Sequence, residues 1–166
     1  SHPSLYLARV NLAKTMAKLK QYPEAIAEYQ KVEEALKADP AVAQVEARLS
    51  DIYVAMAEAC QDQGLFDQTC AYYLKAIELT PPVDPAVPFN LAELLFSNHR
   101  VDEAIRYYQL AIQLKPDFGL YELKLGYAFL NQGEMSSAVE HLKKFLALSP
   151  DDPQAESVRK ILETIK

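Results

Sequence analysis

Residues 101–116 read VDEAIRYYQLAIQLKP, a stretch whose small and apolar side chains recur three or four positions apart. Ala104, Ile105 and Tyr108 illustrate this spacing, which places side chains on one face of a helix. Pro116 ends the pattern because proline cannot continue a helix. The stretch therefore predicts a helix that buries a face of small and aromatic residues.

The same pattern recurs along the chain at nearly fixed intervals. Four columns of matching residues share one register, and their successive members are 44, 35 and 34 residues apart. Two columns hold mostly small residues, one holds large aliphatic residues and one holds mostly tyrosine. In chain order the columns are Ala13, Ala57, Ala92 and Gly126; Ala25, Thr69, Ala104 and Ala138; Leu12, Met56, Leu91 and Leu125; and Tyr29, Tyr73, Tyr108 and Leu142. A fixed period of about 20 to 50 residues is typical of a repeat architecture.

Each repeat is expected to hold two helices that are joined by a short turn and closed by proline. Glycine occupies two of the four turns, where it suits the left-handed backbone that ends a helix. The four turns centre on Lys20, Gly64, His99 and Gly133, and the closing prolines are Pro40, Pro81, Pro116 and Pro150. These breaks place the repeats at about residues 6–39, 50–83, 85–118 and 119–152.

The last segment, residues 153–166, predicts a capping helix. Its apolar residues fall on one face, as expected of a helix that covers the end of a repeat array. They are Ala155, Val158, Ile161, Leu162 and Ile165.

The combination of small residues, aromatic residues and terminal prolines resembles the tetratricopeptide repeat family. The resemblance is clearest over residues 101–116 and 131–150, and similar text recurs at residues 22–29 and 66–73. It implies an all-α fold: a right-handed α-solenoid of antiparallel helix pairs, with about nine helices. We therefore expect residues 1–166 to form a single domain of this type, either alone or as a segment of a larger protein.

Two departures from the family pattern carry structural expectations. The first interval exceeds the usual period by ten residues, yet residues 41–48 contain no glycine and many good helix formers. We therefore expect longer helices there, with the second helix overrunning residues 31–38 and the third starting near Pro40. Thr69 stands where the family usually has alanine, so we expect a slightly wider helix crossing.

Charge and composition disfavour several classes of function. The net charge is −6, and residues 40–99 hold the whole surplus with two basic and eight acidic residues. Such a segment repels phosphate backbones, so we expect no nucleic-acid binding. No apolar run reaches the roughly 18 residues of a membrane span, so no direct membrane insertion is expected. Cys60 and Cys70 are expected to be free thiols, which favours a reducing compartment such as the cytoplasm.

The sequence offers no constellation for catalysis. Of the three histidines, His2, His99 and His141, only His99 has a histidine, cysteine or aspartate three or four residues away, and Asp102 alone does not complete a metal site. We expect them to be solvated, with His141 on the exposed side of a helix. No phosphate-binding glycine loop, nucleophile elbow or paired-cysteine zinc spacing is found. The chain is therefore not expected to be an enzyme or to need a cofactor or metal.

What remains is a surface formed by the first helix of each pair, which lines the concave groove in arrays of this kind. We expect a basic entrance, then an acidic middle with no cation nearby, then an apolar and aromatic patch. The candidate ligand-binding residues are Asn11, Lys14, Asp51, Val54, Glu58, Asp62, Phe89, Asn90, Glu93, Phe96, Leu123, Lys124, Tyr127 and Asn131.

Two groups of these candidates have competing interpretations. Asn11 and Asn90 occupy the register in which related repeats grip a peptide backbone, and the alternative is that they are solvated or bond within the repeat array. Phe89, Leu123 and Tyr127 either contact a ligand or shield neighbouring helices.

A subset of the family that this chain resembles binds the C-terminus of heat-shock chaperones through lysines and asparagines. Here Val54 and Glu58 stand where that clamp needs lysine and asparagine, and Leu120 replaces another lysine. Glu58 would repel the ligand carboxylate, so we reject a chaperone-tail clamp.

The leading interpretation is a non-catalytic scaffold that holds a partner protein or peptide in its groove. The acidic middle and aromatic patch predict a partner with basic and apolar residues, and self-association stays an open alternative. A second interpretation is a regulatory or assembly module of a larger multidomain protein or enzyme, whose own chain fills the groove. RNA-binding helical repeats are disfavoured because the groove lacks a basic lining.

Overall fold

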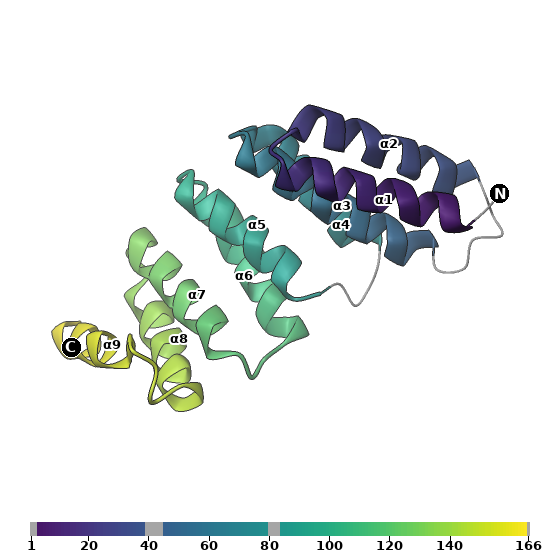
Figure 1. Cartoon of the computed structure of the whole chain (residues 1–166). Coiled ribbons are helices and arrows are strands. Elements are labelled where there is room, and N and C mark those ends of the chain that lie inside the picture. Colours follow the sequence, from purple (N-terminus) through teal and green to yellow (C-terminus); the bar gives the residue numbers. More distant parts are fainter. Residues whose placement is uncertain (1–2, 39–44, 80–83, 166) are drawn as a thin grey trace. The chain divides into compact units, whose positions relative to one another are not determined.

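The computed structural model describes residues 3–38, 45–79 and 84–165, which form nine α-helices without a β-strand (Figure 1). The prediction of an all-α protein with four helix pairs and a final cap is confirmed. The helices are α1 (Pro3–Lys18), α2 (Tyr22–Ala38), α3 (Val45–Asp62), α4 (Phe66–Leu79), α5 (Ala86–Ser97), α6 (Val101–Leu114), α7 (Gly119–Gln132), α8 (Met135–Leu148) and α9 (Ala155–Thr164).

The helices gather into two compact units, Ser1–Val83 and Asp84–Lys166. In unit 1, α1 pairs with α2, α3 pairs with α4, and α2 packs against α3. In unit 2, α5 pairs with α6, α7 pairs with α8, α6 packs against α7, and α9 packs against α8. Each unit thus holds two successive helical hairpins whose second and third helices are in contact.

The turn inside each hairpin depends on one residue with left-handed backbone. Lys20, Gly64, His99 and Gly133 have φ angles of 60°, 72°, 62° and 79°. At the end of α7, this conformation lets the Glu134 amide donate to the Phe129 carbonyl at 2.9 Å. The predicted turns are confirmed, and lysine and histidine adopt a conformation that costs a non-glycine residue about 1 kcal/mol or more.

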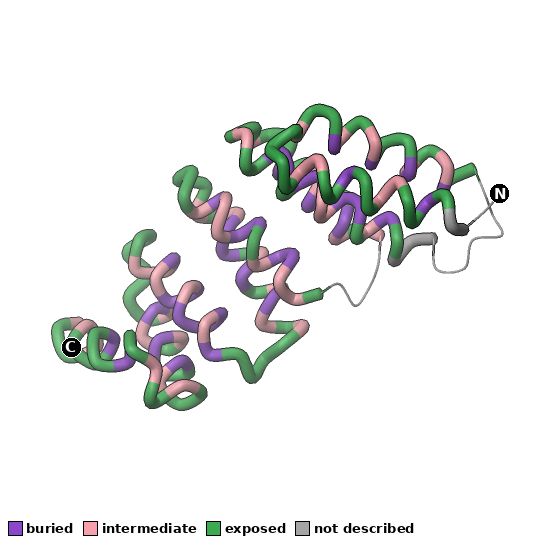
Figure 2. Tube along the Cα trace, viewed as in Figure 1, coloured by how far each residue is buried: buried purple, intermediate pink, exposed green. Residues whose placement is uncertain are grey.

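Small residues occupy matching positions in the first helix of each repeat. Ala13, Ala57 and Ala92 are completely buried there, and buried positions recur along the helices in Figure 2. At Gly126 a Cβ atom would lie only 2.8 Å from Cδ2 and Cγ of Leu142 on the facing helix. Since real Cβ atoms do not approach so closely, a larger residue at this position would force the Leu142 side chain to shift.

The long first interval lengthens helices within the described residues. The helix α2 has 17 residues and α3 has 18, whereas α4, α6, α7 and α8 each have 14. The helix α2 reaches Ala38, and an overrun past this residue lies outside the described residues. The expected helix start near Pro40 lies outside the described residues.

The capping helix closes unit 2 through an apolar cluster and a polar connection. Ala155 and Val158 of α9 are buried together with Leu123, Leu142 and Phe145, while Ile161 and Leu162 pack beside them, so the predicted cap is confirmed.

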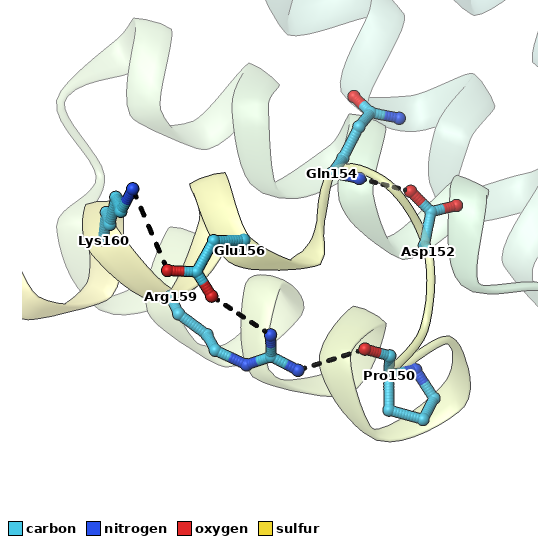
Figure 3. Close-up of polar contacts among 6 residues, drawn as sticks. All are labelled: Pro150, Asp152, Gln154, Glu156, Arg159 and Lys160. Atoms are coloured by element: carbon cyan, nitrogen blue, oxygen red, sulfur yellow. Dashed lines mark hydrogen bonds and ion pairs between the residues drawn. The ribbon is translucent and has the colours of Figure 1, made fainter.

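The segment before α9 is held by side-chain contacts to its own backbone (Figure 3). The Asp152 carboxylate accepts from the Gln154 amide at 2.8 Å, and the Arg159 guanidinium donates to the Pro150 carbonyl at 3.0 Å. Glu156 lies 3.5 Å from Arg159 and 3.8 Å from Lys160, so ionic groups occupy the outer face of α9.

Replacing Gly126→Ala should lower the free energy of unfolding by about 1–3 kcal/mol, because the added methyl group meets Leu142. In an open helix the same change is stabilising, so the sign of the effect is diagnostic. Thermal melts followed by circular dichroism measure it. In a Leu142→Ala background the cost should fall, and a raised melting temperature for Gly126→Ala alone would contradict the close crossing.

Replacing Val158→Asp should destabilise the chain by about 2–4 kcal/mol, because it places an unpaired charge in the apolar cluster under α9. Ser157→Asp is the matched control, since Ser157 is exposed on the same helix. Chemical denaturation of both variants measures the difference. Equal stability of the two variants would show that α9 does not cap unit 2.

Candidate functional site

In unit 1 the candidate residues lie on α1 and α3, the first helices of two repeats. Asp51, Glu58 and Asp62 are exposed and are spaced by seven and four residues, which places them on one face of α3. We call these three residues the α3 acidic row. Val54 lies between them and is half-buried, so it belongs partly to the packing of the unit.

The α3 acidic row keeps its charge available. Among the described residues, Asp51 and Glu58 form no ion pair. Asp62 accepts a hydrogen bond from Tyr22, and partial burial together with this bond raises the pKa of the Tyr22 hydroxyl. Burial and then the nearby Glu58 carboxylate raise the pKa of Tyr29. The row can therefore attract a cation from solution.

The candidates on α1 are exposed as well. Asn11 and Lys14 both face solvent, and the Asn11 carbonyl accepts a hydrogen bond from the Thr15 hydroxyl at 2.8 Å. Because α1 also contacts α3, unit 1 places an amide and an ammonium group on the helix next to the α3 acidic row.

In unit 2 the predicted acidic residue Glu93 is already neutralised. The Lys124 Nζ lies 2.5 Å from the Glu93 Oε2, so an ion pair bridges α5 and α7. The Tyr108 hydroxyl donates to the other carboxylate oxygen, and burial followed by Glu93 raises the pKa of Tyr108. The prediction that Glu93 has no cation nearby was wrong. The reason is that the ion pair joins two consecutive repeats: Lys124 belongs to the fourth repeat and Glu93 to the third.

The residues of the predicted apolar and aromatic patch mostly pack against other side chains of unit 2. Leu123 is completely buried in the cluster under α9, so the prediction that it lines a surface was wrong. Tyr127 is half-buried against the same cluster, and burial followed by Asp152 of the cap segment raises its pKa. Phe89 is half-buried, with its ring 4.8 Å from Tyr121.

The remaining candidates of unit 2 are polar or partly covered. Asn90 and Asn131 are exposed on α5 and α7, and Phe96 is half-buried. With Glu93 and Lys124 paired, unit 2 offers amide groups and a neutral ion pair, and its first helices carry no acidic row comparable to that of α3.

His141 is not a solvated histidine, contrary to the prediction. Its Nδ1 lies 2.6 Å from the Glu122 Oε2, and the two side chains are only 16% and 6% exposed. The His141 ring also stacks on Phe129, with centroids 5.4 Å apart. The residue therefore joins α7 to α8 inside the fourth repeat.

Similar pairs occur at the same register of other repeats. Arg9 and Glu28 form an ion pair at 2.8 Å, and they are 19 residues apart like Glu122 and His141. Tyr53 and Tyr72 have the same separation and stack with centroids 6.3 Å apart. Lys75 lies 5.2 Å from the Tyr53 ring centre. The three contacts share a separation of 19 residues, but the residue types differ from repeat to repeat.

Three further features concern metal binding, membrane-spanning helices and the cysteine thiols. Within residues 3–38, 45–79 and 84–165, no group of three or more histidine, cysteine or acidic side chains could hold a metal ion. Over the same residues, no helix has the length and apolar character needed to cross a membrane. Cys60 and Cys70 are buried and form no disulfide, and burial raises the pKa of the Cys60 thiol.

Comparison with protein families identifies repeats in three places. Models described as "Tetratricopeptide repeat" match residues 50–82, 89–118 and 122–152. Together these matches cover more than half of the chain.

Curated relatives share the repeats over part of the chain. A Hsp70-Hsp90 organizing protein of Triticum aestivum is 30% identical over 104 residues, which are 63% of this chain and 18% of that protein. A peroxisomal targeting signal receptor of Candida albicans is 34% identical over 84 residues, covering 50% of this chain and 14% of the receptor. The chain thus spans less than a fifth of the length of these relatives.

Solved structures share the fold. MamA aligns with a TM-score of 0.70 at 22% identity, covering 92% of this chain and 86% of that chain. The first TPR of Spaghetti bound to an HSP90 peptide aligns with a TM-score of 0.62 at 21% identity, covering 71% and 94%.

Replacing Glu122→Gln should lower the free energy of unfolding by about 1–3 kcal/mol, because the buried contact to His141 loses its charge. Combining it with His141→Phe should give a coupling energy of about 0.5–3 kcal/mol in a double-mutant cycle. Glu156→Gln is the control, since Glu156 is exposed and its ion pairs are with Arg159 and Lys160 on α9. A cycle with no coupling would contradict the contact.

Proposed function

The chain belongs to the tetratricopeptide repeat family, and we propose that it is a non-catalytic module that holds a segment of a partner protein against the first helices of its repeats. Relatives named as a Hsp70-Hsp90 organizing protein and as peroxisomal targeting signal receptors support an interaction role. A solved repeat domain of this fold has a peptide bound.

The observation that carries the proposal is the α3 acidic row. Its carboxylates are exposed, and Asp51 and Glu58 keep no cation within the described residues. A row of like charges on one helix face raises the local concentration of cationic segments and speeds their association. The partner segment therefore carries lysine or arginine.

The neighbouring helix α1 supplies polar groups for the same segment. The exposed Asn11 amide can donate to a peptide carbonyl and accept from a peptide amide. Because these bonds go to the backbone, they favour an extended segment without specifying its sequence. The side chains of the segment are selected by the α3 acidic row.

Unit 2 by itself offers partly exposed apolar residues on its first helices. Tyr127 and Phe96 retain exposed surface, whereas Leu123 does not. Exposed charge pairs contribute little to affinity, so apolar anchors supply most of it.

An acidic chaperone tail is a poor ligand for these surfaces. Glu58 would repel its carboxylates, and the Lys124 ammonium group is engaged by Glu93. Leu120 is half-buried against the cap cluster and offers no charge.

The alternative of a module acting on its own parent protein draws on the length of the relatives. Since the matched region is less than a fifth of those proteins, a segment elsewhere in a parent chain could occupy the same row. The chemistry of such a segment would be the same, with basic residues facing α3.

The test compares binding of a fluorescent peptide with leucines and lysines to variants of the chain. Asp51→Lys with Glu58→Lys should weaken binding about tenfold and flatten its salt dependence. Glu34→Lys with Glu78→Lys is the matched control, since these exposed residues lie on the second helices α2 and α4. Equal weakening by the control pair, or no weakening by the first pair, would refute the assignment of the α3 acidic row.

A further inference from the structure

The two hairpin turns of unit 1 each expose a leucine. Leu19 follows the end of α1 and is 66% exposed, and Leu65 precedes α4 and is 38% exposed. Leu19 stands directly before Lys20 and Leu65 directly after Gly64, the left-handed residues of the two turns. Both leucines are therefore carried at the tips of helical hairpins.

Exposure at these two positions is a property of the turns in every repeat. The residues that stand in the same places in the other turns are all polar, and all are exposed except Gln63, which is half-buried. Gln63, Asn98 and Gln132 match Leu19, and Gln21, Arg100 and Glu134 match Leu65. The leucines are thus exposed because they lie in turns, including repeats whose first helix is covered by a preceding helix.

The charges beside the two leucines have opposite signs. Lys18 and Lys20 are exposed on either side of the first leucine, whereas Asp62 and Asp67 are exposed before and after the second. None of these four residues forms an ion pair within the described part of the chain. Single exposed leucines are ordinary on a protein surface, so it is the flanking charges that distinguish this one.

The two turns lie next to each other at one end of unit 1 (Figure 1). The Tyr22 hydroxyl at the start of α2 bonds to the Asp62 carboxylate at the end of α3. Residues 18–24 carry a net charge of +1 from two lysines and Glu24, and residues 62–68 carry −2 from two aspartates. The unit 1 turn edge is our name for Lys18, Leu19, Lys20, Asp62, Leu65 and Asp67.

We propose that the unit 1 turn edge is a self-association surface through which two copies of the chain form a symmetric dimer. In a two-fold interface, each contact between two residues occurs twice with the roles of the copies exchanged. A two-fold axis between two such edges places the first turn of one copy on the second turn of the other. Leu19 then meets Leu65 of the second copy, and lysines face aspartates at both ends of the interface.

The same charges disfavour the other occupants. A basic segment would meet Lys18 and Lys20, and an acidic segment would meet Asp62 and Asp67. An anionic lipid surface would likewise be repelled by the two aspartates. The edge needs a partner with both signs of charge in reversed order beside apolar residues, and a second copy of the chain has this arrangement.

The dimer is independent of the proposed function. Asp51 and Glu58 lie further back along α3, so the dimer leaves them open to a partner segment. With six side chains from each copy, the unit 1 turn edge is small, and interfaces of small area are typically weak and reversible. Dimerisation is therefore expected to depend on the concentration of the chain.

Sedimentation equilibrium of the full chain over a series of concentrations tests the proposal. It should show a reversible equilibrium between monomer and dimer. Leu19→Ser and Leu65→Ser should each weaken the dimer about tenfold, because each substitution removes both copies of the leucine contact.

Charge reversal provides the sharper test. Lys18→Glu with Lys20→Glu should prevent dimerisation, because four acidic groups then face each other at each end of the interface. Asp62→Lys with Asp67→Lys should prevent it in the same way with basic groups. An equimolar mixture of the two variants should dimerise again, because every contact between unlike copies joins opposite charges.

Two controls match these variants. Glu34→Lys with Glu78→Lys changes the net charge as much as the aspartate reversal, but at exposed positions of α2 and α4 away from the turns. Met135→Ser removes a side chain that is 47% exposed beside the α7–α8 turn of unit 2. Both should leave the dimer unchanged, and circular dichroism checks that every variant is folded.

Four results would overturn the proposal. They are a monomer at all concentrations, equal weakening by either control, a mixture of the two charge-reversed variants that stays monomeric, and Leu19-dependent binding of phosphatidylserine vesicles by a monomeric chain. The last result would assign the unit 1 turn edge to a membrane surface.

Discussion

The close approach of paired helices at a small residue is the constraint on which the rest of the structure depends. Ala13, Ala57, Ala92 and Gly126 are buried at the same register of four repeats, and a Cβ atom at Gly126 would collide with Leu142. Because helices that cross so closely fix each other's rotation, the crossing also fixes which side chains turn inward. The tyrosine column is buried as well, and each first helix keeps some residues exposed to solvent.

Much of the fold could be predicted from the sequence because the residues that pack in every repeat recur at the repeat interval. The small column, the tyrosine column and the left-handed turn residues all behave in this way, and so does the apolar face of the cap. The contacts that were missed vary from repeat to repeat. Arg9 with Glu28, Tyr53 with Tyr72 and Glu122 with His141 join the same two positions through different chemistry. No single residue type recurs there, so periodicity alone does not reveal the pairing.

The candidate site was predicted less completely, for two physical reasons. Exposure of a first-helix residue depends on what lies beyond its own hairpin, and the cap helix covers Leu123. Charge depends on the adjacent repeat, and Lys124 neutralises Glu93 across α5 and α7. The α3 acidic row agrees with the prediction because its residues project from one helix and meet no cation in the described part of unit 1. Helical spacing alone was sufficient to place them.

Packing buries the inner faces of each hairpin, and we infer that the first helices are the ones that contact a partner. Amide chemical shifts of the full chain, recorded by NMR during titration with the lysine-and-leucine peptide, test this claim most directly. The account predicts that the largest changes fall near Asn11 and Lys14 on α1 and near Asp51 and Glu58 on α3. Changes concentrated on the second helices α2 and α4 would contradict it, because those helices would then carry the binding surface.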